Sequence, residues 1–408
     1  MSDKSSTAGE TRATMAGAMD GVRVLDLTIA LSGPMAMGIL ADQGADVIKV
    51  EPPGLGDIGR WVGVAAGGVS AMSQMSSRGK RSIALNLHEE DGRAILRELV
   101  ADADVFAQNF RPGVIEKLGF GYEEVARLNS EIVYLSISGF GPHGPYAARS
   151  AYDPVVQAVG GLAAAQAPAE GEPQLIRNTA ADKISGLTAA QAVSAALFAR
   201  ARGRGGQHVE LAMMDAVVQF VWQDAAGNEV LLDSDGSQPS SFSRDQKLWP
   251  TRDGWVIAAP VSDADVAGIC RAVEVDGWDV PELRTIVDRR IHGDLFRALL
   301  KRVMDAVQQR TTAEVMEAMG REKAPAGAVL APAEQHLDPQ LQAMETFEES
   351  VHPTAGRLRQ PRPAARFSAT PARTGGPCPT LGENSDEILR ELGRGDAIAD
   401  LRARGIVA

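Results

Sequence analysis

Short apolar runs rich in β-branched residues alternate, over the first half of the chain, with segments whose apolar residues recur at helical spacing. Strands are expected at residues 22–27, 46–51, 82–87, 104–110, 132–140 and 208–214. Helical spacing occupies residues 34–45, 90–103 and 112–129 between them. This alternation is typical of a parallel sheet covered by helices on both faces. The pattern therefore predicts an α/β fold with an open, doubly wound sheet.

The pattern changes after the sixth apolar run. One long helix is expected over residues 215–232, followed by a link rich in Ser, Asp, Gly and Pro, a hairpin over 248–261 and a helical stretch over 292–320. A last helix is expected to begin at Glu383 and to pack back on the first domain. The predicted divisions are a disordered tail (1–19), a large domain (20–225), a linker with a smaller α+β domain (226–340) and a returning carboxyl-terminal segment (341–408).

Composition and charge narrow the class of protein. The 408 residues are 44% apolar and 23% charged, as in soluble globular proteins, and the formal net charge of -12 argues against a nucleic-acid partner. No apolar run is long enough for a membrane span, and the amino end lacks the apolar core of a secretory signal. Cys270 and Cys378 form neither a close pair nor a disulfide framework. A cytoplasmic protein with no membrane contact is expected.

Three common kinds of active site are disfavoured. The turn after the first expected strand carries Gly33 and Gly38 but no GxGxxG fingerprint, although Glu51 ends the second strand. The six histidines are scattered without metal-ligand spacing, so no metal is expected. No GxSxG pentapeptide occurs, which disfavours a serine hydrolase.

Basic residues follow several of the expected strands, where open sheets bind ligands. These cations suit a phosphorylated ligand: Arg60, Lys80, Arg81, Arg111 and Lys117. Pro112 is expected to open a helix at its first position, which leaves N–H donors free for an acceptor. The glycines at 139–141 are candidates for donors to an oxyanion.

Asp182 heads a long run of small apolar residues, at the expected start of a helix. As an N-cap it would contribute about 1 kcal/mol, but Asn178 or Thr179 could cap equally well. With an ordinary pKa near 3.9 it would be ionised at neutral pH and could act as a nucleophile without a partner base. Both roles stay open on the residues alone.

Eight segments, in order along the chain, resemble the family III CoA-transferases. They include "GADVIKVEPPGLGD", "NFRPGVIEKLGF", "SGFGPHGPY", "YDPVVQAVGGL" and "ADKISGLTAAQAVSAALFARARGRGGQHVEL". The resemblance implies a large Rossmann-like domain built from both ends of the chain, a small domain and a homodimer of two interlocked rings. It also implies that Asp182 attacks an acyl-CoA to give an aspartyl anhydride, and that an aspartyl-CoA thioester then passes CoA to an acceptor acid.

The same resemblance implies a binding site for the CoA thioester, which is a substrate rather than a permanently bound cofactor. It assigns this site to Ala30, Leu31, Ser32, Leu85, His88, Asn109, Phe110, Arg111, Lys117, Leu118, Ser138, Gly139 and Phe140. Formyl-CoA transferase has a glutamine at the position of Leu31 and a lysine at that of Ser138. Its glycine-rich flap has no counterpart in residues 233–243. These departures disfavour a formyl/oxalate substrate pair.

Two other functions remain open. The related α-methylacyl-CoA racemases need an acid and a base on opposite faces of the substrate, one of them usually a histidine. Tyr152 occupies the position of that histidine, and His143, nine residues earlier, is a poor substitute. A protein that binds acyl-CoA without turnover would not need Asp182. The sequence therefore favours acyl-CoA:carboxylate CoA transfer.

Overall fold

The computed structural model describes residues 17–167, 171–234 and 246–408, and it divides into two compact units. One unit contains Met1–Phe242 together with Glu345–Ala408, and the other contains Ser243–Met344. Most of the predicted amino-terminal tail and of segment 233–243 lies outside the described residues. Met19 donates its backbone N–H to the carbonyl of Gln43 at 2.9 Å. The described chain is therefore tied to the large unit from its first residues.

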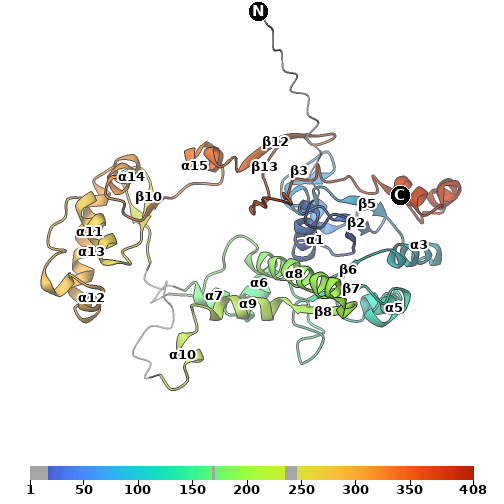
Figure 1. Cartoon of the computed structure of the whole chain (residues 1–408), viewed down its shortest axis with the longest axis horizontal. Helices are drawn as coiled ribbons and strands as arrows, with labels where there is room; N and C mark the ends of the chain where they lie inside the picture. Colours follow the sequence, from blue (N-terminus) through green and yellow to red (C-terminus); the bar gives the residue numbers. More distant parts are fainter. Residues whose placement is uncertain (1–16, 168–170, 235–245) are drawn as a thin grey trace, which may run out of the picture. The chain divides into compact units, whose positions relative to one another are not determined.

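A six-stranded sheet forms the centre of the large unit (Figure 1). Its strands, all parallel, lie in the order β5-β2-β1-β6-β7-β8. They are β1 (Arg23–Asp26), β2 (Asp46–Glu51), β5 (Arg81–Ala84), β6 (Val105–Gln108), β7 (Val133–Ser138) and β8 (Gln207–Ala212). Each coincides with a predicted run, so the predicted α/β fold with an open parallel sheet is confirmed. The order reverses between β1 and β6, which is the Rossmann arrangement, and ligands bind at such a reversal.

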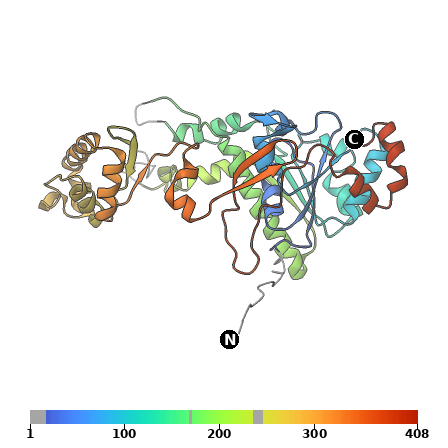
Figure 2. The same ribbon diagram turned by 90° about the horizontal axis from the view of Figure 1, so that it is seen from above.

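Both faces of the sheet are buried, as expected when apolar residues run continuously along a strand. Val24 points into one core, with α1 (Ser32–Asp42), α8 (Ala180–Ala199) and α9 (Met213–Trp222). The neighbouring Leu25 points into the other core, with α3 (Glu90–Ala101), α4 (Val114–Lys117), α5 (Tyr122–Leu128), α16 (Ser385–Glu391) and α17 (Ile398–Ala403). Figure 2 shows these carboxyl-terminal helices, in red, beside α3 and α5.

The remaining elements of the large unit are short. They are β3 (Ala65–Ala66), β4 (Val69–Ser70), α2 (Ala71–Ser77), α6 (Asp153–Val159), α7 (Leu162–Ala165), α10 (Gly227–Val230), β12 (Phe347–His352) and β13 (Gly356–Pro361). The single long helix predicted over 215–232 is wrong, because α9 ends at Trp222 and α10 is a separate turn of helix. The helix predicted to open at Pro112 is also wrong, since α4 begins at Val114 after Gly113, which has φ 87°.

The second unit has its own core of helices against a small sheet. The predicted hairpin is present as β9 (Trp249–Pro250) and β10 (Trp255–Ala258), joined through a hydrogen bond from Thr251 N–H to Gly254 O of 2.9 Å. Its other elements are α11 (Asp263–Ala272), α12 (Ile286–Ile291), α13 (Gly293–Gln308), α14 (Thr312–Arg321), β11 (Ala326–Ala328) and α15 (Pro339–Ala343). The helical stretch 292–320 is two helices, because Thr311 and Glu314 form a capping box that starts α14.

Candidate active site

A cavity of about 430 Å³ opens where the strand order reverses, at the carboxyl ends of β1, β6 and β7. Asp182 lines it. So do eight other residues singled out from the sequence: Ala30, Ser32, Asn109, Phe110, Arg111, Ser138, Gly139 and Tyr152. The eight residues come from three connections far apart in the chain, β1–α1, β6–α4 and β7–α6. The fold therefore gathers them around one carboxylate.

A second cavity, of about 480 Å³, adjoins the first and shares Phe110 and Val114 with it. Four further residues of the expected CoA site line this second cavity: Leu85, His88, Lys117 and Leu118. Leu31 and Phe140 line neither cavity. Phe140 is 8% exposed and packs edge-on against Tyr146, with ring centroids 5.6 Å apart. The two cavities therefore share part of their walls, and Asp182 lines only the first of them.

Asp182 lies in the first turn of α8 but does not cap that helix. The helix begins at Ala180, and Thr179 at the N-cap position makes no side-chain cap. The capping acceptor is Asp153, whose Oδ1 accepts the backbone N–H of Asp182 at 3.0 Å. A second residue of the site thus satisfies the helix end, which leaves the Asp182 carboxylate available for chemistry.

The sequence alone suggested an ordinary pKa for Asp182, but the structure gives a raised one. Burial of the side chain, together with the negative charge of Asp153, raises the pKa to about 6. The carboxylate is still mostly ionised at neutral pH. A carboxylate with a raised pKa is a better nucleophile than an exposed one, because a more basic oxygen forms its new bond more readily.

Asp153 is buried and is held by a hydrogen-bond network. Its Oδ2 accepts a hydrogen bond from Gln157 Nε2 at 2.6 Å, and Gln157 also bonds both the N–H and the carbonyl of Ile176. The segment leading into α8 is therefore fixed relative to α6. Tyr152, the residue before Asp153, is 65% exposed and lines the cavity, whereas His143 does not.

The loop between β1 and α1 forms one wall of the cavity and is held by buried polar side chains. Asn109 bonds both backbone groups of Ile29, at 2.8 and 2.9 Å. Asp57 Oδ1 accepts the N–H of Ala30 at 2.8 Å, and Lys49 Nζ donates to Thr28 O at 2.6 Å. Ala30 has φ 66°, a left-handed conformation that a residue with a side chain rarely adopts. These contacts hold it in that conformation.

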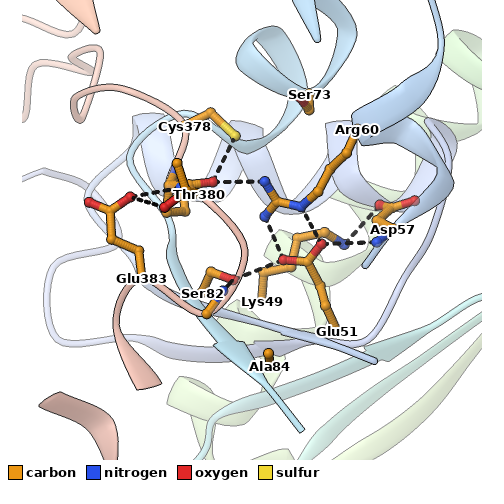
Figure 3. Close-up of polar contacts among 12 residues, drawn as sticks. Lys49, Glu51, Asp57, Arg60, Ser73, Ser82, Ala84, Cys378, Thr380 and Glu383 are labelled. Carbon is orange, nitrogen blue, oxygen red and sulfur yellow. Dashed lines mark hydrogen bonds and ion pairs between the residues drawn. The ribbon is translucent and has the colours of Figure 1, made fainter. Parts of the chain in front are cut away.

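Asp57 and Lys49 also belong to a buried cluster of three acidic and three basic side chains. Figure 3 shows two of its pairs, Lys49–Asp57 at 3.1 Å and Arg60–Glu51 at 2.6 Å. The third pair is Lys80–Asp26 at 2.8 Å. Lys80 Nζ also donates to Pro34 O, in the first turn of α1, at 2.9 Å. Arg60 donates to Pro379 O at 2.9 Å, which ties in the carboxyl-terminal segment. The interpretation of Arg60 and Lys80 as phosphate ligands is therefore wrong.

The other three cations differ in whether they line a cavity. Arg81 pairs with Asp46, Glu387 and Glu391, so it is structural, while Arg111 and Lys117 line the cavities as expected. The carboxylates Asp26 and Asp57, which organise the loop, were missed. For Asp26 the available signal was a charged residue in an otherwise apolar strand, "VLDL", whereas Asp57 lies outside the strands and gave no such signal.

The expected oxyanion donors at 139–141 are at least partly occupied. The N–H of Gly141 donates to Ser138 Oγ at 3.0 Å and is not free for a ligand. Within the described residues, no group of three or more His, Cys, Asp or Glu side chains could hold a metal ion. Across the same residues, no helix is long and apolar enough to span a membrane.

Comparisons with known proteins cover nearly the whole chain. A model described as CoA-transferase family III matches residues 19–385. The chain is 31% identical to succinyl-CoA:glutarate CoA-transferase of Homo sapiens, over 95% of this chain and 90% of that protein. It is 32% identical to formyl-CoA:oxalate CoA-transferase of Rhodopseudomonas palustris (strain HaA2), over 97% and 98% respectively. A crystal structure of a CAIB/BAIF family protein from Brucella suis superposes with a TM-score of 0.79 at 29% identity, covering 92% of this chain and 100% of that one.

Proposed function

The chain belongs to CoA-transferase family III, and from that premise we propose that it moves CoA from an acyl-CoA to a carboxylic acid through covalent intermediates on Asp182. The observation that carries this proposal is the position of Asp182, a half-buried carboxylate with a raised pKa that lines one of two adjoining cavities. The transferase names of the relatives, and Tyr152 in place of a histidine, support transfer over racemisation.

In the first half-reaction, a carboxylate oxygen of Asp182 attacks the thioester carbonyl carbon. The C–S bond breaks, CoA leaves as its thiolate, and an aspartyl anhydride forms. The thiolate then attacks the aspartyl carbonyl of this anhydride, which releases the donor acid and leaves an aspartyl-CoA thioester. The acceptor carboxylate attacks that thioester carbonyl and gives a second aspartyl anhydride and free CoA thiolate. The thiolate finally attacks the acyl carbonyl of the acceptor, which forms the new acyl-CoA and frees the Asp182 carboxylate. Anhydrides hydrolyse easily, so the site must exclude water during turnover.

The CoA thioester would lie across both cavities. The mainly apolar walls around Leu85, Phe110 and Leu118 suit the adenine, and Lys117 and Arg111 supply charge for the phosphates. The reactive thioester would then reach the cavity of Asp182. His88, Asn109, Ser138 and Gly139 would contact the remainder of the molecule.

The acceptor acid would be a dicarboxylic acid. Arg149 lines the cavity of Asp182, and its guanidinium lies 3.9 Å from the centre of the Tyr146 ring. No carboxylate pairs with it among the described residues. Such a guanidinium suits the second carboxylate of a diacid whose first carboxylate reacts. The acceptors named for the two curated relatives, glutarate and oxalate, are both dicarboxylates.

The active form would be a cytoplasmic homodimer. Large apolar side chains on α8 and α9 are exposed in the single chain: Leu187 at 56%, Phe198 at 67%, Phe220 at 55% and Trp222 at 48%. Exposed apolar residues gathered on neighbouring helices are typical of a protein interface. Cys270 and Cys378 are both buried free thiols, which suits a reducing compartment.

The test is to trap the intermediate. Wild-type protein incubated with an acyl-CoA and hydroxylamine should acquire a hydroxamate at Asp182, detected by peptide mass spectrometry. Asp182→Ala should abolish turnover and the adduct. The dissociation constant of this variant for CoA should stay within about tenfold of the wild-type value. Full activity in that variant would reject the proposal. An acyl-CoA that exchanges its α-proton with solvent, without any adduct, would indicate racemisation instead.

A further inference from the structure

The hydroxyl of Ser32 has no function in the fold. Ser32 is 3% exposed and lines the cavity of Asp182. Within the described part of the chain, its Oγ makes no hydrogen bond, and it is not among the enclosed polar atoms that lack a partner. A buried hydroxyl normally satisfies its hydrogen-bonding capacity within the protein or with water. This one is left open toward the space beside the carboxylate.

Packing of two helices brings Ser32 and Asp182 to the same place. Ser32 is the first residue of α1, and α8 crosses it at Gly186, where a Cβ atom would lie only 2.8 Å from Ser32 O. Asp182 precedes Gly186 by four residues, so both lie on one face of α8 a single turn apart. The close crossing at Gly186 therefore sets Asp182 beside the start of α1.

The start of α1 also carries a positive potential. It is an 11-residue helix without an acidic residue in its first turn, and Leu31 gives it no side-chain cap. The first N–H groups of a helix have no intrahelical acceptor, and the helix dipole favours negative charge at that end. With Ser32 Oγ as a further donor, these groups suit an oxyanion.

Buried contacts keep this arrangement from relaxing. Lys80 fixes the carbonyl of Pro34 in the first turn of α1, and Asp57 fixes Ala30 just before it. Lys49 pairs with Asp57 and donates to Thr28 O, so it holds the loop before α1 as well. Donors held rigidly before the reaction stabilise developing charge without a reorganisation cost.

We propose that Ser32 is a catalytic residue that donates its hydroxyl hydrogen bond to the oxyanion formed at Asp182, a role that rests on the proposed function. When a carboxylate oxygen of Asp182 bonds to the thioester carbon, the electron pair of the C=O bond moves to oxygen. Ser32 Oγ–H and the start of α1 stabilise that charge. The pair returns to re-form C=O as the C–S bond breaks and CoA leaves as thiolate. No proton is transferred, and Ser32 stays protonated.

The test compares Ser32→Ala with wild type in single-turnover acylation of Asp182 by an acyl-CoA, trapped with hydroxylamine. Loss of one oxyanion donor should slow acylation about 100-fold, while KM for the acyl-CoA stays within about twofold. Ser76→Ala is the matched control, because Ser76 is equally buried, lines neither cavity and bonds Met72 O within α2. Its acylation rate should be unchanged.

The outcomes separate this inference from the proposed function. Absence of any Asp182 adduct in wild type would reject the proposed function itself. An adduct that forms in Ser32→Ala at the wild-type rate would reject only the role of Ser32. Should Ser32→Ala not fold, Ser32→Cys keeps the shape with a weak donor and should show the same split between kcat and KM. Wild-type kcat in Ser32→Cys would then contradict the inference.

Discussion

At the scale of single residues, the site depends on a carboxylate whose ionised form is destabilised by its surroundings. Asp182 is partly buried beside Asp153, and this raises its pKa to about 6. Acylation requires the ionised form, so we expect its rate to fall tenfold per pH unit below about pH 6 and to level off above pH 7. The measurement is the pH profile of single-turnover acylation. A profile that stays flat down to pH 5 would contradict the raised pKa.

The same shift makes a prediction for stability. The folded state holds the Asp182 proton more tightly than the unfolded state, whose pKa is near 3.8. Between about pH 4 and 6 the wild type therefore loses stability as pH rises, whereas Asp182→Asn does not. The variant should be inactive yet melt at a higher temperature than wild type at pH 7.5, with the difference vanishing near pH 4. Equal melting curves at both pH values would count against it.

Arg149 should set the choice of acceptor acid. Replacing it by Gln removes the cation and leaves the CoA cavity intact, since Arg149 lines only the cavity of Asp182. We expect Arg149→Gln to raise KM for a dicarboxylic acceptor at least tenfold and to leave KM for a monocarboxylic acceptor of equal length within about twofold. Steady-state kinetics with matched acid pairs measure this. A uniform loss with both acids would assign Arg149 to CoA or to folding.

At the scale of elements, the position of Asp182 depends on the close crossing of α1 and α8. A Cβ on Gly186 would lie 2.8 Å from Ser32 O, which is backbone and cannot move aside alone. Gly186→Ala should therefore destabilise the protein by about 1–3 kcal/mol and lower kcat, because the helices must separate. Gly320→Ala in α14 meets nothing within 4 Å and should be neutral or slightly stabilising. Thermal unfolding and kinetics of both variants test this, and an unchanged Gly186→Ala would refute it.

Sequence reasoning found the elements whose signal lies within the element itself. Runs such as "DVIKVE" are rich in β-branched apolar residues, so all six strands of the central sheet were predicted. Helix ends were harder, because capping by Thr311 divides one apparent helix into α13 and α14. The exposed strands β12 and β13 carry little apolar pattern and were missed.

The site was only partly readable for a related reason. Asp182 and most cavity residues came from resemblance, whereas the pKa of Asp182 depends on its burial and on Asp153, 29 residues away in sequence. Arg60 and Lys80 looked like ligands because their partners lie on other strands. Which cation is paired and which is free depends on contacts that no local pattern records.

At the scale of the whole molecule, the large unit is closed by the end of its own chain. The edge of β5 accepts hydrogen bonds from the carboxyl-terminal segment, including Asn384 N–H to Ser82 O at 2.9 Å and a bridge between Leu85 and Val407. The core beneath α3 is completed by Ile388, Leu389, Leu401 and Ile406, each 3% exposed or less. An edge strand left open exposes unpaired N–H and C=O groups.

Removing residues 377–408 should therefore unfold the large unit. Four buried aliphatic side chains contribute on the order of 10 kcal/mol, as much as the whole stability of a typical domain. The second unit has a separate core around Val303 and Val256, so it should survive. We expect limited proteolysis of the truncated chain to leave a protected fragment close to Ser243–Met344, while acyl-CoA binding is lost.

The control is Arg402→Ala, which breaks only an exposed ion pair with Asp386 and should change the free energy of unfolding by less than about 1 kcal/mol. A truncated chain that binds acyl-CoA and unfolds like the full-length protein would show that the large unit folds without the carboxyl-terminal segment.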